Sequence, residues 1–171
     1  MASFNGCKRY GNFGQYRRRF FSLGPAMIAS CAMQVKKDAI YLVSEIKKGI
    51  ESQAPGGVPF IPLADSTKKR KGSSKALIDT QAMMGAVTHV PVRPITEFIG
   101  LLRTQMHKAK DGKTMSMANL GLIHEQPYYK ASGKGLKRIP ARSFIGPVAK
   151  KEMPGIIERF KAAAAAPVNV P

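Results

Sequence analysis

Residues Met27–Ile50 read "MIASCAMQVKKDAIYLVSEIKKGI" and carry the clearest periodicity in the chain. Apolar side chains recur there every three or four residues, the spacing that puts them on one face of a helix. This apolar stripe consists of Ile28, Cys31, Val35, Ala39, Leu42, Ile46 and Ile50. The pattern predicts a long amphipathic helix with its stripe in the core. We expect it to begin near Ser22–Pro25, where a serine cap precedes a proline allowed in the first turn, and to end near Ser52.

The segment before this helix, residues 1–23, is basic and aromatic. It has no acid, and its cations are Lys8, Arg9, Arg17, Arg18 and Arg19, interleaved with phenylalanines, tyrosines and glycines. Charge and glycine oppose packing, so we expect an extended arm whose aromatic side chains anchor on a partner surface. A flexible, solvated terminus without a role is the alternative.

The whole chain is strongly basic. Its 171 residues include 28 Lys and Arg against 10 Asp and Glu, a formal net charge of +18. This charge predicts a nearby polyanion or acidic protein surface. The length fits one domain, which we place at residues 24–166, with a frayed tail at 167–171.

Residues 54–76 contain prolines and glycines that break regular structure, and we expect a flexible basic loop. Its cation cluster is Lys68, Lys69, Arg70 and Lys71. Such a run fits a nucleic-acid contact, a nuclear-import patch or a solvated face.

Further elements follow along the chain. A turn over Asp79–Met84 leads into a strand at 87–92, and a second strand is favoured within 95–106, before a hairpin-like turn at Asp111-Gly112. "SMANLGLIHE" (116–125) predicts a short helix. Residues 127–138 are expected to be flexible. A last helix should span about 147–166 and be kinked or interrupted at Pro154-Gly155.

No catalytic, metal or cofactor site is predicted, and we do not expect an enzyme. His89, His107 and His124 lack a metal-binding spacing, and His124-Glu125 is expected to be a buried or interfacial pair. The two cysteines are expected to be free thiols. The charged first residues and the lack of a long apolar run predict a chain that is kept in the cytosol without a membrane segment.

Two blocks carry a family resemblance: "PLADSTKKRKGSSKALIDTQAMMGAVT" (62–88) and "IHEQPYYKASGKGLKRIPARSFIGP" (123–147). Together with "EFIGLLR" and "ANLGLIHE", they resemble in order and spacing the tail-completion family of tailed bacteriophages, also called virion morphogenesis or neck proteins. Three positions depart from the family pattern. Gln81 and Pro127 stand at or near usual glycines, and Ser143 replaces a proline.

The resemblance implies an α+β fold, in which a long N-terminal helix packs on a small, mainly antiparallel sheet, with a short helix and a C-terminal helix. It also implies a homo-oligomeric ring, six- or twelvefold, at the head–tail junction of the virion, assembled in the host cytoplasm. Portal or adaptor proteins, tail proteins and packaged DNA are the implied partners. The arginines and lysines at 17–19 and 68–71 would face a partner or DNA, and Asp79 and Thr80 would belong to a turn motif.

The segment "RIPARSF" would then join the sheet to the last helix. Its candidate assembly residues are Arg138, Ile139, Pro140, Ala141, Arg142 and Phe144. Pro140 favours an extended backbone, the Arg142 guanidinium can grip a carboxylate, and Phe144 supplies an anchor. An intrachain junction and a contact between subunits both remain open.

The rival hypothesis is a basic nucleic-acid-binding protein, ribosomal or nucleoid-like. It rests on the basic arm and the "KKRK" run, although no base-reading motif accompanies them.

Overall fold

The computed structural model describes residues 13–78, 81–108, 112, 114–132 and 135–167. The predicted turn motif at Asp79 and Thr80 lies outside the described residues, as do the first twelve residues of the predicted arm and most of the predicted tail. The fold is α+β, with a long N-terminal helix, small antiparallel sheets and a C-terminal helix, which confirms the predicted class.

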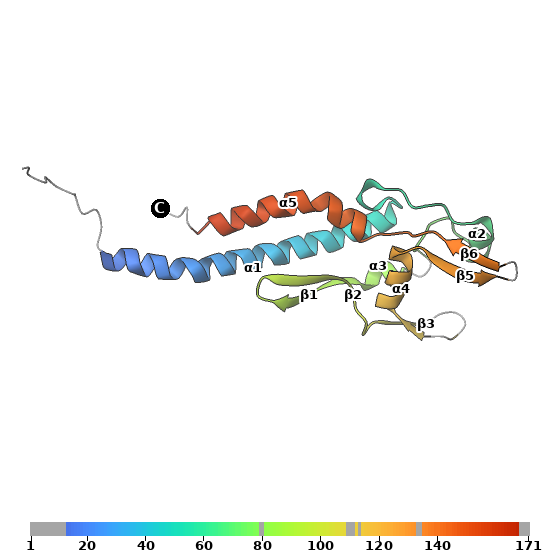
Figure 1. Ribbon diagram of the computed structural model, residues 1–171, viewed down its shortest axis with the longest axis horizontal. Helices are drawn as coiled ribbons and strands as arrows, with labels where there is room; N and C mark the ends of the chain where they lie inside the picture. Colours follow the sequence, from blue (N-terminus) through green and yellow to red (C-terminus); the bar gives the residue numbers. More distant parts are fainter. Residues whose placement is uncertain (1–12, 79–80, 109–111, 113, 133–134, 168–171) are drawn as a thin grey trace, which may run out of the picture.

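Two helices form the long axis of the molecule. Helix α1 (Phe13–Glu51) runs antiparallel to α5 (Gly146–Ala165), and the hairpin of β1 (Val87–Arg93) and β2 (Thr96–Leu101) lies along α1 on another side (Figure 1). Helix α1 therefore packs against both α5 and the β1–β2 hairpin.

Three polar contacts fix how α5 lies on α1. The Ser30 hydroxyl donates to the Ala163 carbonyl at 2.8 Å, near the end of α5. The Arg159 guanidinium donates to the buried Asp38 carboxylate at 2.6 Å. The Tyr41 hydroxyl donates to the Glu152 carboxylate at 2.7 Å, and this hydrogen bond is the main reason that the pKa of Tyr41 is raised above its ordinary value.

The predicted stripe forms the core along most of α1. Its buried members are Cys31, Ala39, Leu42, Ile46 and Ile50. Leu42, Ile46 and Ile50 pack with residues of β1, β2, α3 and α4, with Phe144 just before α5 and with Val148 in its first turn. Val35 is partly buried, and Ile28 is 52% exposed. The predicted buried face is therefore confirmed for five stripe residues, is partial at Val35 and is wrong for Ile28.

All strand pairs in the described chain are two-stranded antiparallel hairpins. β1 pairs with β2 from Val87↔Leu101 to Arg93↔Thr96, with a bulge near the prolines. β3 (Met106–Lys108) pairs with β4 (Thr114–Ser116), and the Asp111 of the predicted turn between them lies outside the described residues. β5 (Tyr128–Ser132) pairs with β6 (Gly135–Ile139).

Short helices connect these hairpins. The 3₁₀ turn η1 (Pro55–Gly57) and helix α2 (Asp65–Lys71) follow α1, and α3 (Ala82–Ala86) precedes β1. The predicted short helix is α4 (Met117–Glu125). Its capping residue Ser116 accepts a hydrogen bond from the Asn119 amide at 3.3 Å, as expected for a serine N-cap.

Four local predictions are wrong. The long helix begins at Phe13, so residues 13–23 are helical rather than an extended arm; arginine favours helix, and one proline at position 25 removes a single internal hydrogen bond. The loop at 54–76 contains η1 and α2. Residues 128–132 and 135–139, which were predicted to be flexible, pair as antiparallel strands, and Gly135 begins the second strand at a positive φ that glycine adopts readily. Helix α5 is continuous through Pro154, so the interruption predicted at Pro154-Gly155 does not occur.

Gly49 allows η1 to pack against α1. A Cβ at this position would lie 2.7 Å from the Cα of Pro55, a backbone atom. We predict that Gly49→Ala lowers the free energy of unfolding by about 1–3 kcal/mol, because the added methyl group forces the two segments apart. Urea unfolding followed by far-UV circular dichroism measures this loss.

Gly85→Ala in α3 is the matched control, since nothing lies within 4 Å of its added Cβ. It should leave stability equal or slightly higher, as alanine favours helix over glycine. Equal stabilities of the two variants would contradict the close packing at Gly49.

Candidate functional site

The Glu125 carboxylate at the end of α4 binds the segment that begins α5. One oxygen, Oε1, accepts hydrogen bonds from the amides of Phe144 at 2.9 Å and Ile145 at 2.8 Å. The other oxygen accepts from the Ser143 hydroxyl. The cap residue of α5, Ile145, has no side-chain acceptor of its own. Glu125 therefore supplies, from a different element, the anion that a helix N-terminus favours.

Arg142 ties the same segment to two other parts of the chain. Its amide donates to the His124 carbonyl at 2.7 Å. Its guanidinium donates to the carbonyls of Ile61 at 3.1 Å and Pro62 at 3.2 Å. Burial lowers the pKa of Arg142 from its ordinary value. Within the chain, the guanidinium therefore binds main-chain oxygens and not the carboxylate that was expected.

Phe144 completes the junction from inside. It is fully buried and belongs to the core cluster with Leu101. Gly121 of α4 lies close to both, since a Cβ there would come within 2.4 Å of Leu101 Cδ1 and 3.9 Å of the Phe144 ring. A side chain with no exposure cannot contact another subunit, so the predicted anchor acts within the chain.

The remaining junction residues are more accessible. Arg138 at the end of β6 is exposed, whereas Ile139, Pro140 and Ala141 are partly buried. We name the contacts of Glu125, Arg142 and Phe144 the motif junction. It joins segments from positions 61–62, 124–125 and 142–145, so the sequence blocks that carry the resemblance meet in space.

The sequence analysis did not identify Glu125 as the main hydrogen-bond acceptor of the motif junction. The "HE" pair was expected to be buried or interfacial, but its role in capping α5 depends on an amide that is 19 residues away. The pairing of Arg142 with Ile61 spans about 80 positions and has no local signal.

Gln81 shows the effect of a departure from the family pattern. It takes the left-handed conformation at φ 56°, ψ 1°, directly before α3. The turn therefore keeps the positive φ that glycine would adopt more easily.

The two basic clusters lie at opposite ends of the molecule (Figure 1). Arg17, Arg18 and Arg19 are exposed near the start of α1. The second cluster lies on α2, where Lys68 pairs with Asp65 at 3.1 Å and Lys69 is exposed. Arg70 and Lys71 belong to α2, and their side chains lie outside the described part. The fold does not combine these clusters into one basic site.

The start of α1 extends beyond its neighbours. Ser30 already contacts Ala163, close to the end of α5 at Ala165, and the tip of the β1–β2 hairpin lies beside Ala32–Lys36. Residues 13–28, which we name the projecting segment, continue past both (Figure 1). Its described side chains are exposed apart from Leu23 and Met27, which are partly exposed.

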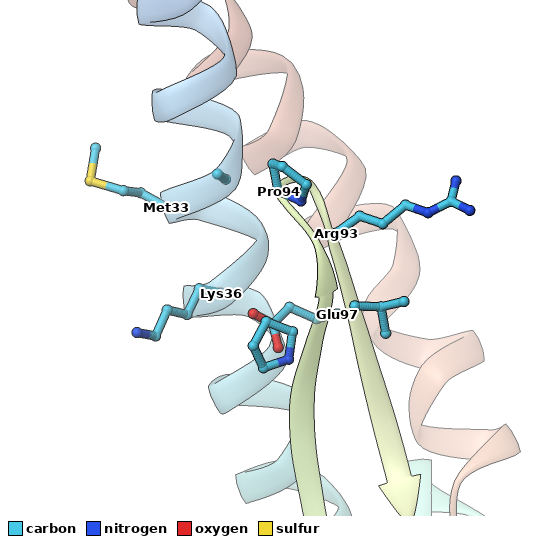
Figure 2. Close-up of a pocket in the computed structure, with 8 residues that line it drawn as sticks. Met33, Lys36, Arg93, Pro94 and Glu97 are labelled. Carbon is cyan, nitrogen blue, oxygen red and sulfur yellow. The ribbon is translucent and has the colours of Figure 1, made fainter.

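A surface groove separates α1 from the hairpin tip. Its volume is about 470 Å³. Figure 2 shows Met33 and Lys36 on α1, Arg93 and Pro94 at the tip, and Glu97 between the two elements. Met33 is 61% exposed and Val92 is 60% exposed, so the groove has an uncovered apolar rim.

Glu97 is held in this groove by an internal partner. Its carboxylate lies 3.0 Å from Nδ1 of His89 on the paired strand. A second apolar groove of about 450 Å³ follows between α1, β2 and α5, with Ile99, Ile157 and Phe160 among its walls. The apolar surface along α1 is thus accessible over much of its length.

The described residues contain neither a metal-binding cluster nor a membrane-spanning helix. His, Cys, Asp and Glu side chains form no group of three or more that could hold a metal ion in those ranges. No helix in the described part is both long and apolar enough to cross a bilayer.

Comparisons of the chain with protein-family models, curated proteins and solved structures find no significant match.

Removing the Glu125 carboxylate should weaken the motif junction. We predict that Glu125→Ala lowers the free energy of unfolding by about 2–4 kcal/mol, because it leaves the amides of Phe144 and Ile145 without an acceptor. Glu125→Gln keeps one acceptor oxygen and should cost about 1 kcal/mol. Urea unfolding measures both.

Ser143→Ala is the matched control, because it removes only the hydroxyl donor at the same carboxylate. Its effect should stay near 1 kcal/mol or below. If Glu125→Ala and Ser143→Ala destabilised the protein equally, the amide contacts would not support α5.

Proposed function

We propose that this protein is a structural component of the neck of tailed bacteriophages. It forms a homo-oligomeric ring, six- or twelvefold, at the head–tail junction, where it completes or terminates the tail and joins it to the head connector. Its partners are portal or adaptor proteins and tail proteins, with packaged DNA in the channel. It acts in the virion, after assembly in the host cytoplasm.

The motif junction is the observation that carries this proposal. The ordered sequence blocks of the neck-protein resemblance are far apart in the chain, yet Pro62, Glu125 and Arg142 meet through specific hydrogen bonds. The side chains of Glu125 and Arg142 form their hydrogen bonds with main-chain groups of other segments. The resemblance is thereby explained as a shared scaffold, which is what a family of structural proteins would retain.

The surface of the chain also fits a role in assembly. Large apolar side chains are exposed on both helices and on the hairpins, among them Phe20, Met33, Val92, Leu136 and Met153. An apolar surface of this extent is typical of a protein that is covered by neighbours. The charge of +18 adds a requirement for anionic neighbours, since a ring multiplies this charge by its copy number.

The neck role can be tested by localisation. We predict that cryo-electron microscopy of purified virions, with a tag on the C-terminus of this chain, places a symmetric collar of label between head and tail. Absence of the protein from particles, with nucleic acid copurifying with it instead, would contradict the proposal and support the nucleic-acid-binding alternative.

Assembly should also depend on ionic strength. The Debye length falls from about 8 Å at 0.15 M salt to about 3 Å at 1 M, so contacts of exposed cations weaken. We expect sedimentation of purified heads or tails with this protein to show reduced binding at about 1 M salt. Binding that does not change with salt would contradict a charge-assisted neck contact.

A further inference from the structure

The projecting segment continues the stripe of α1, and no described element covers it. Counting back from Cys31 at intervals of three and four gives Ile28, Gly24, Phe21 and Arg17. Cys31 is 6% exposed, whereas Ile28 is 52% and Phe21 is 68% exposed. The same helix face therefore changes from core to surface where α5 and the hairpin end.

A helix of this composition gains little stability by itself. The segment spans 16 residues, roughly 24 Å at 1.5 Å per residue. It contains Gly24 and Pro25, which oppose helix formation by about 1 and 3 kcal/mol relative to alanine. A partner that covers the Phe21 and Ile28 face would offset this cost and stabilise the helix.

The charge of this helix end specifies the chemistry of such a partner. Arg17, Arg18 and Arg19 lie within its first two turns, and no acid occurs in α1 before Asp38. Cations near a helix N-terminus oppose the helix dipole. The Arg17 guanidinium lies 5.7 Å from the centre of the Phe21 ring, so charge and apolar anchor form one continuous surface.

A second copy of this chain offers few carboxylates for these arginines. Eight of the ten acids lie in the described part, and all of them except Glu51 have an intrachain contact. The engaged acids are Asp38, Glu45, Asp65, Glu97, Glu125, Glu152 and Glu158. A different, acidic molecule would therefore offer these arginines more unpaired carboxylates than a second copy of this chain.

We propose that the projecting segment docks, through Phe21 and Ile28, in an apolar groove of a different, acidic protein whose carboxylates pair with Arg17 and Arg18. This inference deepens the proposed function, on which it rests, by giving the chemistry of one neighbour. Nucleic acid fits less well, because a phosphate backbone would pair with the arginines but leave the phenylalanine and isoleucine face in water. A basic helix with an apolar face is the kind of ligand that acidic helix-binding grooves accept.

The partner can be captured by a photocrosslinker. Phe21 is replaced by p-benzoylphenylalanine in the full chain, produced in cells that make the particles, and the crosslinked peptides are identified by mass spectrometry. We expect adducts on one different protein, at apolar residues that are flanked by Asp or Glu. Adducts on a second copy of this chain, adducts on nucleic acid, or no adduct would each overturn the inference.

Two charge-reversal variants make the test specific. Arg17→Glu with Arg18→Glu should lower the adduct yield at least about tenfold, because interface charge pairs are replaced by repulsion. Lys150→Glu with Lys151→Glu, both exposed on α5, makes the same change of charge elsewhere and should stay within about twofold. Equal loss in both variants would mean that net charge alone controls docking, which contradicts a specific groove.

The outcome of the crosslinking experiment can be distinguished from the outcome of the test of the neck role. An adduct with an acidic protein, in cells whose particles carry no label at the head–tail junction, would keep the docking surface and reject the neck assignment. A labelled collar with adducts only on DNA would keep the neck assignment and reject the acidic protein partner.

Discussion

Burial of the second half of α1 is the constraint on which the rest of this fold depends. Each described sheet has only two strands, and an isolated two-stranded hairpin is at best marginally stable in water. The β1–β2 hairpin and α5 gain stability by packing on Ile46 and Ile50, which are nearly or fully buried. Because the core is formed around this half of the helix, the projecting segment (13–28) continues past α5 and the β1–β2 hairpin.

The motif junction shows why a conspicuous sequence motif can be structural. Helix α5 begins without a side-chain cap of its own, and Glu125 of α4 supplies the missing acceptor. Phe144 enters the core next to that contact, and Arg142 holds the chain that follows α1. One short segment thus links the end of the sheet region to both long helices, and its charged groups are used on backbone atoms.

The sequence predicted what depends on local periodicity and missed what depends on distant partners. The stripe from Cys31 to Ile50, the strand at 87–92 and the short helix at 116–125 follow from neighbours within one or two turns. Residues 13–23 were predicted to belong to an arm because charge and glycine oppose packing, yet arginine favours helix and the helix continues through Pro25. The capping of α5 by Glu125 required knowledge of which helix end lies beside α4.

The distribution of charge links this fold to its proposed assembly. Nearly all described acids are used inside the chain, as in the Asp38–Arg159 and Glu97–His89 contacts, and the excess positive charge is left on the surface. Copies of such a protein repel one another at long range. A neighbour that brought carboxylates would remove this repulsion while covering the apolar face of α1. Charge would then delay self-association until the correct partner is present, and the apolar contact would provide the affinity once it has arrived.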